Sequence, residues 1–316
     1  MISPTLLAAP DRGRVRRLLT RTPRWLKILA AGASLWGLSV GVLFATGDEY
    51  VVAAVALGTF VVPLALAAGL GERGKRLGVA PQLMVRLAAC GGLLGFLSSA
   101  LLERPILSAP GPMFDGWVGV IEETSKLAIL AFLTRSLIDR DPRTGFVLGG
   151  LVGVGFSAFE SAGYAISTAI NSGGNSGAVI EMVLSRATAA PFTHVLWTAV
   201  VGAALFASTR DGRFRAAPLL TTTLVAMAAL HAGWDMMPAL AADLRSWLAG
   251  TPPSPGIVVD PTVLIDSGEA LLSAPPLYIA YRLLGRKRMS PAGVERPAIP
   301  SELRPPVVAH IGRSAA

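Results

Sequence analysis

The sequence predicts an all-α fold: a polytopic membrane helix bundle with about eight transmembrane helices and both termini in the cytoplasm. The chain of 316 residues is 52% hydrophobic and only 15% charged, with a mean hydropathy of +0.57. This composition is too apolar for a soluble domain of this size. The apolar residues are also gathered into runs that are each near the ~20 residues needed to span a bilayer.

These runs give the elements in order. Eight of them are expected to be helices, at 25–46, 50–70, 81–102, 113–133, 145–169, 187–208, 216–238 and 262–284. The connections at 171–177 and 251–256 are rich in Gly, Pro, Ser and Asn, which break helices and favour exposed loops.

Charge supports the same count. The stretches on the side of the N-terminus hold 23 of the 28 Lys and Arg residues, and the stretches on the opposite side hold 3. By the positive-inside rule, both termini then lie in the cytoplasm, as an even number of spans requires. The net charge of +8 is therefore interpreted as a topology signal beside a lipid bilayer, and no nucleic-acid partner is expected.

The domain organisation follows from these runs. We expect a basic cytoplasmic tail (1–24), three N-terminal transmembrane helices (25–112), a four-helix core that would be the catalytic one (113–238), an extracytoplasmic loop with the last transmembrane helix (239–288) and a disordered cytoplasmic tail (289–316). The last tail is rich in proline and charge and has no apolar period.

The run at 113–133 carries Glu122, Glu123 and Lys126 in its middle. A charge near the centre of a bilayer costs at least ~2.5 to 3.5 kcal/mol, so three neighbouring charges need a function or a partner. Lys126 is one helical turn from both glutamates and can neutralise either one.

The next three runs also carry ionisable residues: Glu160, His194, and His231 with Asp235. With a rise of ~1.5 Å per residue, all of these fall at similar depths between the midplane and the outer face. A shared depth is what a water-filled chamber built by four helices requires. Tyr164 lies one turn after Glu160 and can donate a hydrogen bond to it.

Each residue also has a purely structural interpretation. Glu122 and Lys126 can form an inert intrahelical pair, and His231 and Asp235 can form a buried hydrogen bond without function. His194 can pack a helix interface. Glu160 has no cation within one turn of its own helix, so its partner must come from another span.

Such a set of residues suits the hydrolysis of an amide. A carboxylate and an imidazole can polarise a water molecule, and a second imidazole can stabilise the oxyanion. A GxSxG motif is absent, and the one cysteine, Cys90, has no histidine in its own run. Zinc is chemically compatible with two histidines and a carboxylate, although the HExxH spacing is absent. If a metal is present, its expected ligands are drawn from His194, His231, Glu123 and Asp235.

These residues resemble the PrsW family of intramembrane proteases, which is related to the CAAX-prenyl endopeptidase group. The similar elements, in the order of the family, are EExxK (Glu122, Glu123, Lys126), an FxxxE element (Phe156, Glu160) with Tyr164, an R...P..HxxWT element (Arg186, Pro191, His194, Trp197, Thr198) and HxxWD (His231, Trp234, Asp235). The resemblance implies a peptidase of the glutamate type or a metal-dependent one.

The resemblance implies that Glu122, Glu123, His194 and His231 are catalytic. The residues expected to support them are Lys126, Glu160, Asp235, Tyr164, Arg186, Trp197 and Trp234. Two positions depart from the pattern, because Ser161 and Asp235 stand where the family often has Asn. An aspartate only accepts hydrogen bonds when ionised, so Asp235 better suits a metal ligand or a residue that orients a histidine.

The expected function is therefore an endopeptidase of the bacterial inner membrane that cuts a membrane-anchored protein near the extracytoplasmic side. The resemblance suggests an anti-sigma factor as the kind of substrate, with Glu122 or Glu123 as the base. Two alternatives remain: a proton- or cation-coupled transporter, which would be expected to show inverted repeats, and a non-catalytic membrane scaffold.

Overall fold

A computed structural model describes residues 22–46, 51–106, 112–138, 140–189, 191–249 and 261–285. The expected disordered tail (289–316) and nearly all of the expected basic tail (1–24) lie outside these residues. The predicted domain boundaries stay a prediction.

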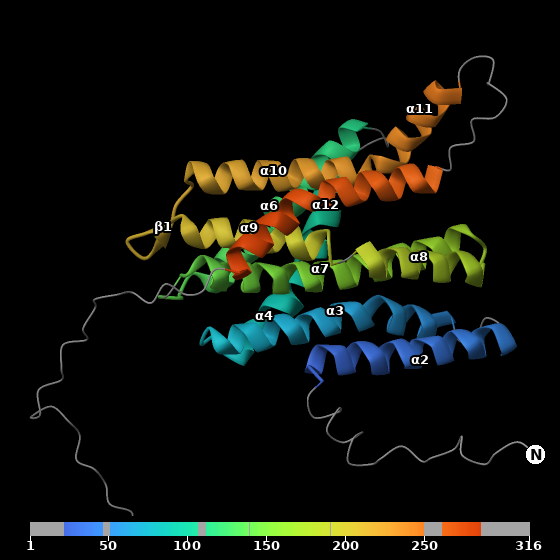
Figure 1. Cartoon of the computed structure of the whole chain (residues 1–316), viewed down its shortest axis with the longest axis horizontal. Coiled ribbons are helices and arrows are strands. Elements are labelled where there is room, and N and C mark those ends of the chain that lie inside the picture. Colours follow the sequence, from blue (N-terminus) through green and yellow to red (C-terminus); the bar gives the residue numbers. More distant parts are fainter. Residues whose placement is uncertain are drawn as a thin grey trace, which may run out of the picture.

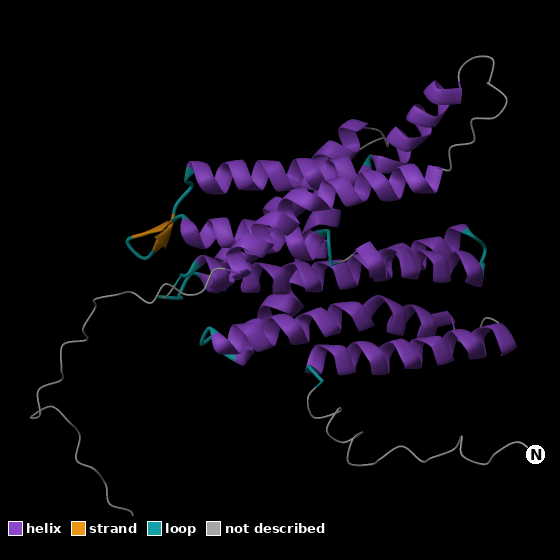
Figure 2. Ribbon diagram, viewed as in Figure 1, coloured by secondary structure: helices purple, strands orange, loops and turns teal. Residues whose placement is uncertain are grey.

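The described chain is almost entirely helical, which confirms the predicted fold class (Figure 2). The helices are α2 (Arg24–Thr46), α3 (Val51–Arg76), α4 (Pro81–Cys90), the π-helix η2 (Gly91–Gly95), α5 (Phe96–Ile106), α6 (Pro112–Thr134), α7 (Pro142–Asn171), α8 (Ser176–Ala189), α9 (His194–Ala207), α10 (Pro218–Asp235), α11 (Met237–Ala249) and α12 (Pro261–Gly285). A two-stranded antiparallel hairpin, β1 (Thr209–Arg210) and β2 (Arg213–Phe214), joins α9 to α10.

Several helices begin at a proline, including α4 at Pro81, α7 at Pro142 and α10 at Pro218. Proline suits the first helical position because its missing N–H has no partner there and its backbone angle is already helical. Asp141 completes the start of α7, where its side chain accepts a hydrogen bond from the backbone N–H of Arg143 at 2.7 Å. The sequence thus fixes where these helices begin.

Helix α7 runs through the middle of the bundle, with α2 and α3 on one side and α9, α10 and α12 on the other (Figure 1). The largest group of buried apolar side chains comes mainly from α7 and α9. The outer helices expose apolar side chains instead, and Leu38 of α2 is 66% exposed. An apolar surface of this kind is expected where lipid surrounds the protein.

Five segments of the described chain are long and apolar enough to cross a membrane: Arg24–Thr46, Val51–Arg76, Pro81–Glu103, Pro142–Asn171 and Ser176–Ala207. The pair Pro218–Asp235 and Met237–Trp247, bent by 56°, makes a sixth if it is one broken span. The predicted count of eight is therefore not confirmed. Helix α6 is not among the five segments because three charged residues lie in its middle. The cytoplasmic location of both termini stays a prediction.

Glycines allow α7 and α9 to touch through their backbones. Gly145, Gly149 and Gly153 lie four residues apart on the face of α7 that meets α9. A Cβ added at Gly153 would lie 2.8 Å from the Cα of Val195, closer than two such atoms can approach. Small residues at this spacing let membrane helices pack closely. The contact at Gly153 fixes the start of α9 against α7.

The π-helix η2 interrupts the span that contains α4 and α5. Its residues Gly91 and Gly92 press against the backbone of α7, since a Cβ added at Gly91 would lie 2.7 Å from the Cα of Val152. A π-turn inserts extra backbone into a helix and is frequent at functional sites. Phe96 follows directly after it and faces the cleft described below.

Candidate active site

Helix α6 supplies a buried group of three charges. Lys126 Nζ donates to Glu122 Oε2 at 3.0 Å and to Glu123 Oε1 at 2.9 Å, and all three residues are at most 5% exposed. The i, i+3 and i, i+4 spacings place one ammonium beside both carboxylates, as the sequence predicted. One of the two negative charges is left without compensation by this lysine.

His194 lies at the start of α9 because the chain breaks just before it. A single helix over 187–208 was expected, but α8 ends at Ala189 and α9 begins at His194. Pro191 explains the break, since proline cannot donate the hydrogen bond that a continuing helix needs. The expectation of one continuous helix was wrong, and the break places His194 within the bundle at a helix terminus.

Both nitrogens of His194 have partners from other helices. The Nδ1 atom lies 2.9 Å from Lys126 Nζ, and the Nε2 atom lies 2.7 Å from Glu160 Oε2. A lysine ammonium has only donors, so Nδ1 must accept and the ring proton is on Nε2, facing Glu160. The tautomer of His194 is therefore set by its two neighbours.

Glu160 finds its cation on α8. The Arg186 guanidinium donates to Glu160 Oε2 and also reaches Ser161 Oγ at 3.3 Å. Glu160 is 8% exposed, so an unpaired carboxylate there would be strongly unfavourable. Arg186 thus supplies the partner from another helix that the sequence required for Glu160.

His231 of α10 lies between three carboxylates. Its Nδ1 is 3.3 Å from Glu123 Oε1, and its Nε2 is 3.6 Å from Glu122 Oε2 and 3.4 Å from Asp235 Oδ2. His231 is 1% exposed, whereas the Asp235 side chain is 30% exposed. The spacing of His231 and Asp235 on one helix face produces their contact, as predicted.

Aromatic rings enclose these polar groups. Lys126 Nζ lies 3.7 Å from the centre of the Phe156 ring, and the Trp197 ring lies 4.8 Å from His231 and 5.6 Å from His194, measured between centres. Trp234 packs edge-on against Trp197 at 6.0 Å. The face of the Phe156 ring favours the Lys126 ammonium.

Three side chains of this group offer possible metal-ligand atoms that lie close together. Glu122, His194 and His231 each offer a ligand atom, and these atoms lie within 4.8 Å of one another. Behind each imidazole, on its second nitrogen, lies a carboxylate: Glu160 for His194 and Glu123 for His231. Metal-binding histidines are typically oriented by such a second carboxylate. Two histidines and a carboxylate are also a common catalytic zinc set.

The charges of this group fit a divalent cation as well. Four carboxylates, those of Glu122, Glu123, Glu160 and Asp235, face two permanent cations, Lys126 and Arg186. When both histidines are neutral, these six groups carry a formal net charge of −2, which matches the charge of a divalent cation. The Lys126 ammonium competes for the site, because it already bonds Glu122 Oε2 and His194 Nδ1.

This grouping differs from the ligand set that the sequence suggested. The three-residue group takes Glu122 as its carboxylate, whereas Glu123 and Asp235 were the acids expected beside the histidines. Glu122 Oε2 lies 3.8 Å from His194 Nδ1 and 3.6 Å from His231 Nε2, whereas Glu123 Oε1 lies 3.3 Å from the other nitrogen of His231. Glu122 therefore lies near both histidines, and Glu123 lies behind His231.

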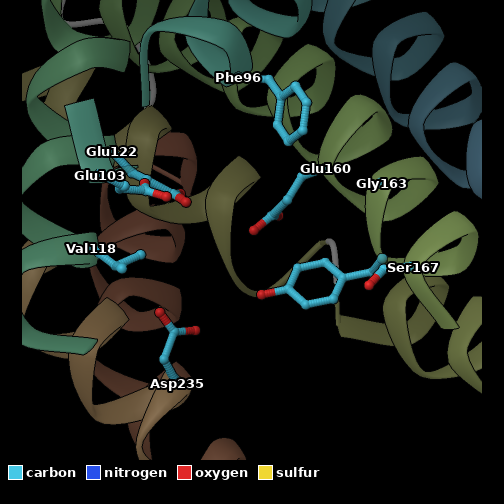
Figure 3. Close-up of a pocket in the computed structure, with 9 residues that line it drawn as sticks. Phe96, Glu103, Val118, Glu122, Glu160, Gly163, Ser167 and Asp235 are labelled. Atoms are coloured by element: carbon cyan, nitrogen blue, oxygen red, sulfur yellow. The ribbon is translucent and has the colours of Figure 1, made fainter. Parts of the chain in front are cut away.

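A cleft of about 460 Å³ opens onto the polar group (Figure 3). Figure 3 shows Glu122, Glu103 and Val118 on one side, Glu160, Gly163 and Ser167 on the other, and Asp235 at one end. Tyr164 also lines the cleft and lies over the Arg186 guanidinium at 4.7 Å from its ring centre. Glu123 is fully buried and is not among the residues that line the cleft.

The structure brings all eleven predicted site residues into one region, although their roles stay predictions. Sequence reasoning missed Glu103, which lines the cleft and has a buried Oε1 without a hydrogen-bond partner among the described residues. Glu103 directly follows the run at 81–102, where a charged residue is ordinary. No pattern in the sequence singled it out, because its place in the cleft depends on how α5 packs beside α6 and α7.

Comparison with known proteins agrees with this geometry. The profile of the PrsW family intramembrane metalloproteases matches residues 81–254, just over half of the chain and the part that holds every predicted site residue. Neither the comparison with curated proteins nor that with solved structures gave a significant match. The chain therefore belongs to the PrsW family of intramembrane metalloproteases, and it is a multi-pass membrane peptidase.

Proposed function

We propose that this peptidase hydrolyses one peptide bond of a single-span, membrane-anchored protein of the anti-sigma-factor kind, at the extracytoplasmic side of a bacterial inner membrane. The observation that carries the proposal is the convergence of Lys126, His194 and His231 on Glu122 Oε2, at the wall of a cleft. A cleft of about 460 Å³ has room for a short extended segment of substrate.

We propose zinc as the cofactor, held by Glu122, His194 and His231. When bound, zinc would polarise the scissile carbonyl and activate a water molecule. The fit rests on the donor types and on their separation of at most 4.8 Å.

Glu160 and Glu123 act as positioning residues for the histidines. Glu160 holds the Nε2 side of His194, which leaves Nδ1 directed toward Glu122. Glu123 faces Nδ1 of His231, which leaves Nε2 directed toward Glu122. A carboxylate behind an imidazole fixes its orientation and makes it a better electron-pair donor.

Asp235 moves the proton. It lines the cleft and is the most exposed of the four carboxylates of the polar group, so a water molecule can reach it. The water oxygen attacks the carbonyl carbon while Asp235 accepts the water proton. The carbon–nitrogen bond then breaks as Asp235 gives that proton to the leaving nitrogen, and the products are a carboxylic acid, which keeps the other hydrogen of the water, and an amine.

The test uses the full chain in liposomes with a single-span substrate. Cleavage should be lost in Glu122→Gln and in His194→Ala, while Glu181→Gln, an exposed glutamate of α8 outside the cleft, should cleave like the wild type. All variants should reconstitute equally. Cleavage that survives in both site variants would overturn the proposal, and so would a wild type that cuts no single-span substrate but carries protons or cations across the membrane.

A further inference from the structure

Two cavities lie at the end of the bundle opposite the cleft, and both are lined by Arg73 and Arg76. These arginines are in the last turn of α3, at the end where α2 and α7 begin and α12 finishes (Figure 1). The first cavity has a volume of about 320 Å³ and the second about 570 Å³. Neither cavity belongs to the active site.

The first cavity gathers positive charge. Arg143, from the first turn of α7, joins Arg73 and Arg76 in lining it, and its other walls are apolar: Leu77, Val147 and Leu284. Among the described residues, no acidic side chain lines this cavity, and neither Arg73 nor Arg76 forms an ion pair. Arg73 and Arg76 carry like charges and repel each other, so an anion placed between them would be favoured.

The second cavity continues from the same two arginines as an apolar groove. Its walls come mainly from α2 and α3, with Pro191 from the connection between α8 and α9, and include Trp25, Leu29, Val62, Leu66 and Leu70. Glu72 is the only acidic residue among the described residues that line it. A groove with a basic end and an apolar length has the two-part chemistry of a phospholipid, with a charged headgroup and an acyl chain.

We propose that this site binds one anionic glycerophospholipid of the leaflet at the basic end. Its phosphate would lie between Arg73 and Arg76, within reach of Arg143, and one acyl chain would lie along the groove between α2 and α3. Guanidinium groups bind phosphate through two parallel hydrogen bonds, and basic pockets between membrane helices favour anionic headgroups. A zwitterionic lipid carries its own cation and would leave the arginines unbalanced.

Basic residues outside the two cavities serve as controls for a nonspecific electrostatic attraction between the protein and anionic lipid. Lys75 lies between the two arginines in sequence, is exposed and lines neither cavity. Arg210 and Arg213 of the β-hairpin are exposed at the same end of the bundle and also line neither cavity. If only the total positive charge of the protein mattered, removing Arg210 and Arg213 would weaken lipid binding as much as removing Arg73 and Arg76.

The experiment measures how much phosphatidylglycerol and phosphatidylcholine stay bound to the purified full chain, by native mass spectrometry. We expect wild type and Arg210→Gln/Arg213→Gln to retain phosphatidylglycerol preferentially, and Arg73→Gln/Arg76→Gln to bind it about 30-fold more weakly, as for the loss of two phosphate contacts. Equal weakening in both double variants would overturn the proposal. So would equal retention of the two lipids by the wild type.

The groove itself is tested at Gly69, which lines it. An added Cβ there would meet Trp25 at 3.7 Å, an ordinary contact, so Gly69→Ala should bind lipid like the wild type. Gly69→Leu should fill the groove and weaken phosphatidylglycerol binding, with unchanged thermal unfolding in lipid-free detergent. Full binding by Gly69→Leu, or displacement of the lipid by millimolar inorganic phosphate, would show that only a phosphate is recognised and would contradict the lipid assignment.

Discussion

Lys126 Nζ lies 2.9 Å from His194 Nδ1, which joins the middle of α6 to the first residue of α9. The same ammonium contacts both glutamates of α6, so one lysine holds three groups that would otherwise carry uncompensated charge or an unpaired nitrogen. It occupies the place where the ligand atoms of Glu122 and His194 meet. Lys126 therefore maintains the site when no other cation is bound there.

The first prediction concerns Lys126→Met. This change removes the cation but keeps the length of the side chain, so the buried glutamates lose their partner at a cost of about 3–5 kcal/mol. We expect a lower unfolding temperature in the presence of a chelator. Added zinc should then raise the unfolding temperature of Lys126→Met by more than it raises that of the wild type. A larger effect of zinc on the wild type would contradict a shared site.

The second prediction concerns Glu160 and Arg186. Glu160→Gln leaves a buried guanidinium without its partner, which should cost about 3–5 kcal/mol of stability. The double variant Glu160→Gln/Arg186→Gln removes both charges and should unfold at nearly the wild-type temperature. Neither variant should cleave substrate well, because His194 loses the carboxylate that orients it. Normal cleavage by the double variant would show that the pair has only a structural role.

The third prediction concerns Asp235→Asn. An amide cannot take the proton of the attacking water, so the cleavage rate should fall about 10²- to 10⁴-fold. Zinc content should stay at the wild-type level, because the three proposed ligands are unchanged. Glu123→Gln is the matched comparison, since a carboxylate behind a ligand histidine mainly affects metal affinity, by about 10- to 100-fold. If Asp235→Asn instead loses its zinc, Asp235 is a ligand and not the proton carrier.

The fourth prediction concerns Gly153→Ala. The new methyl group would lie 2.8 Å from the Cα of Val195, so α7 and α9 must separate. The start of α9 then shifts relative to Glu160, and a misplacement near 1 Å can cost about 10²-fold in rate. Gly37→Ala in α2 meets nothing within 4 Å and serves as the control. Equal activity of the two variants would show that the backbone contact at Gly153 does not position His194.

Much of the site could be predicted because hydrocarbon rejects charge. Glu122, Glu123 and Lys126 stood out in an apolar run, and the separation of His231 from Asp235 by one helical turn predicted their contact. The missing cation near Glu160 likewise predicted a partner from another helix, which is Arg186. In each case a charged side chain in an apolar helix needed a partner, and only a few positions could supply one.

Other features depend on tertiary structure and could not be predicted in the same way. Hydrophobicity alone does not show that Pro191 ends one helix and lets His194 begin another. Which of the two adjacent glutamates lies near both histidines depends on the rotation of α6, which its neighbours set. The count of eight spans is not confirmed, because an apolar run can form a bent or charged helix that does not meet the requirements of a simple span.

The most direct test of the proposed site is metal add-back to the full chain in liposomes with a single-span substrate. After removal of metal by a chelator, cleavage should stop and should return fully when one zinc ion per chain is restored. His194→Ala/His231→Ala should neither bind that ion nor regain cleavage. Full cleavage by the metal-free wild type would contradict the assignment of Glu122, His194 and His231 as a metal centre.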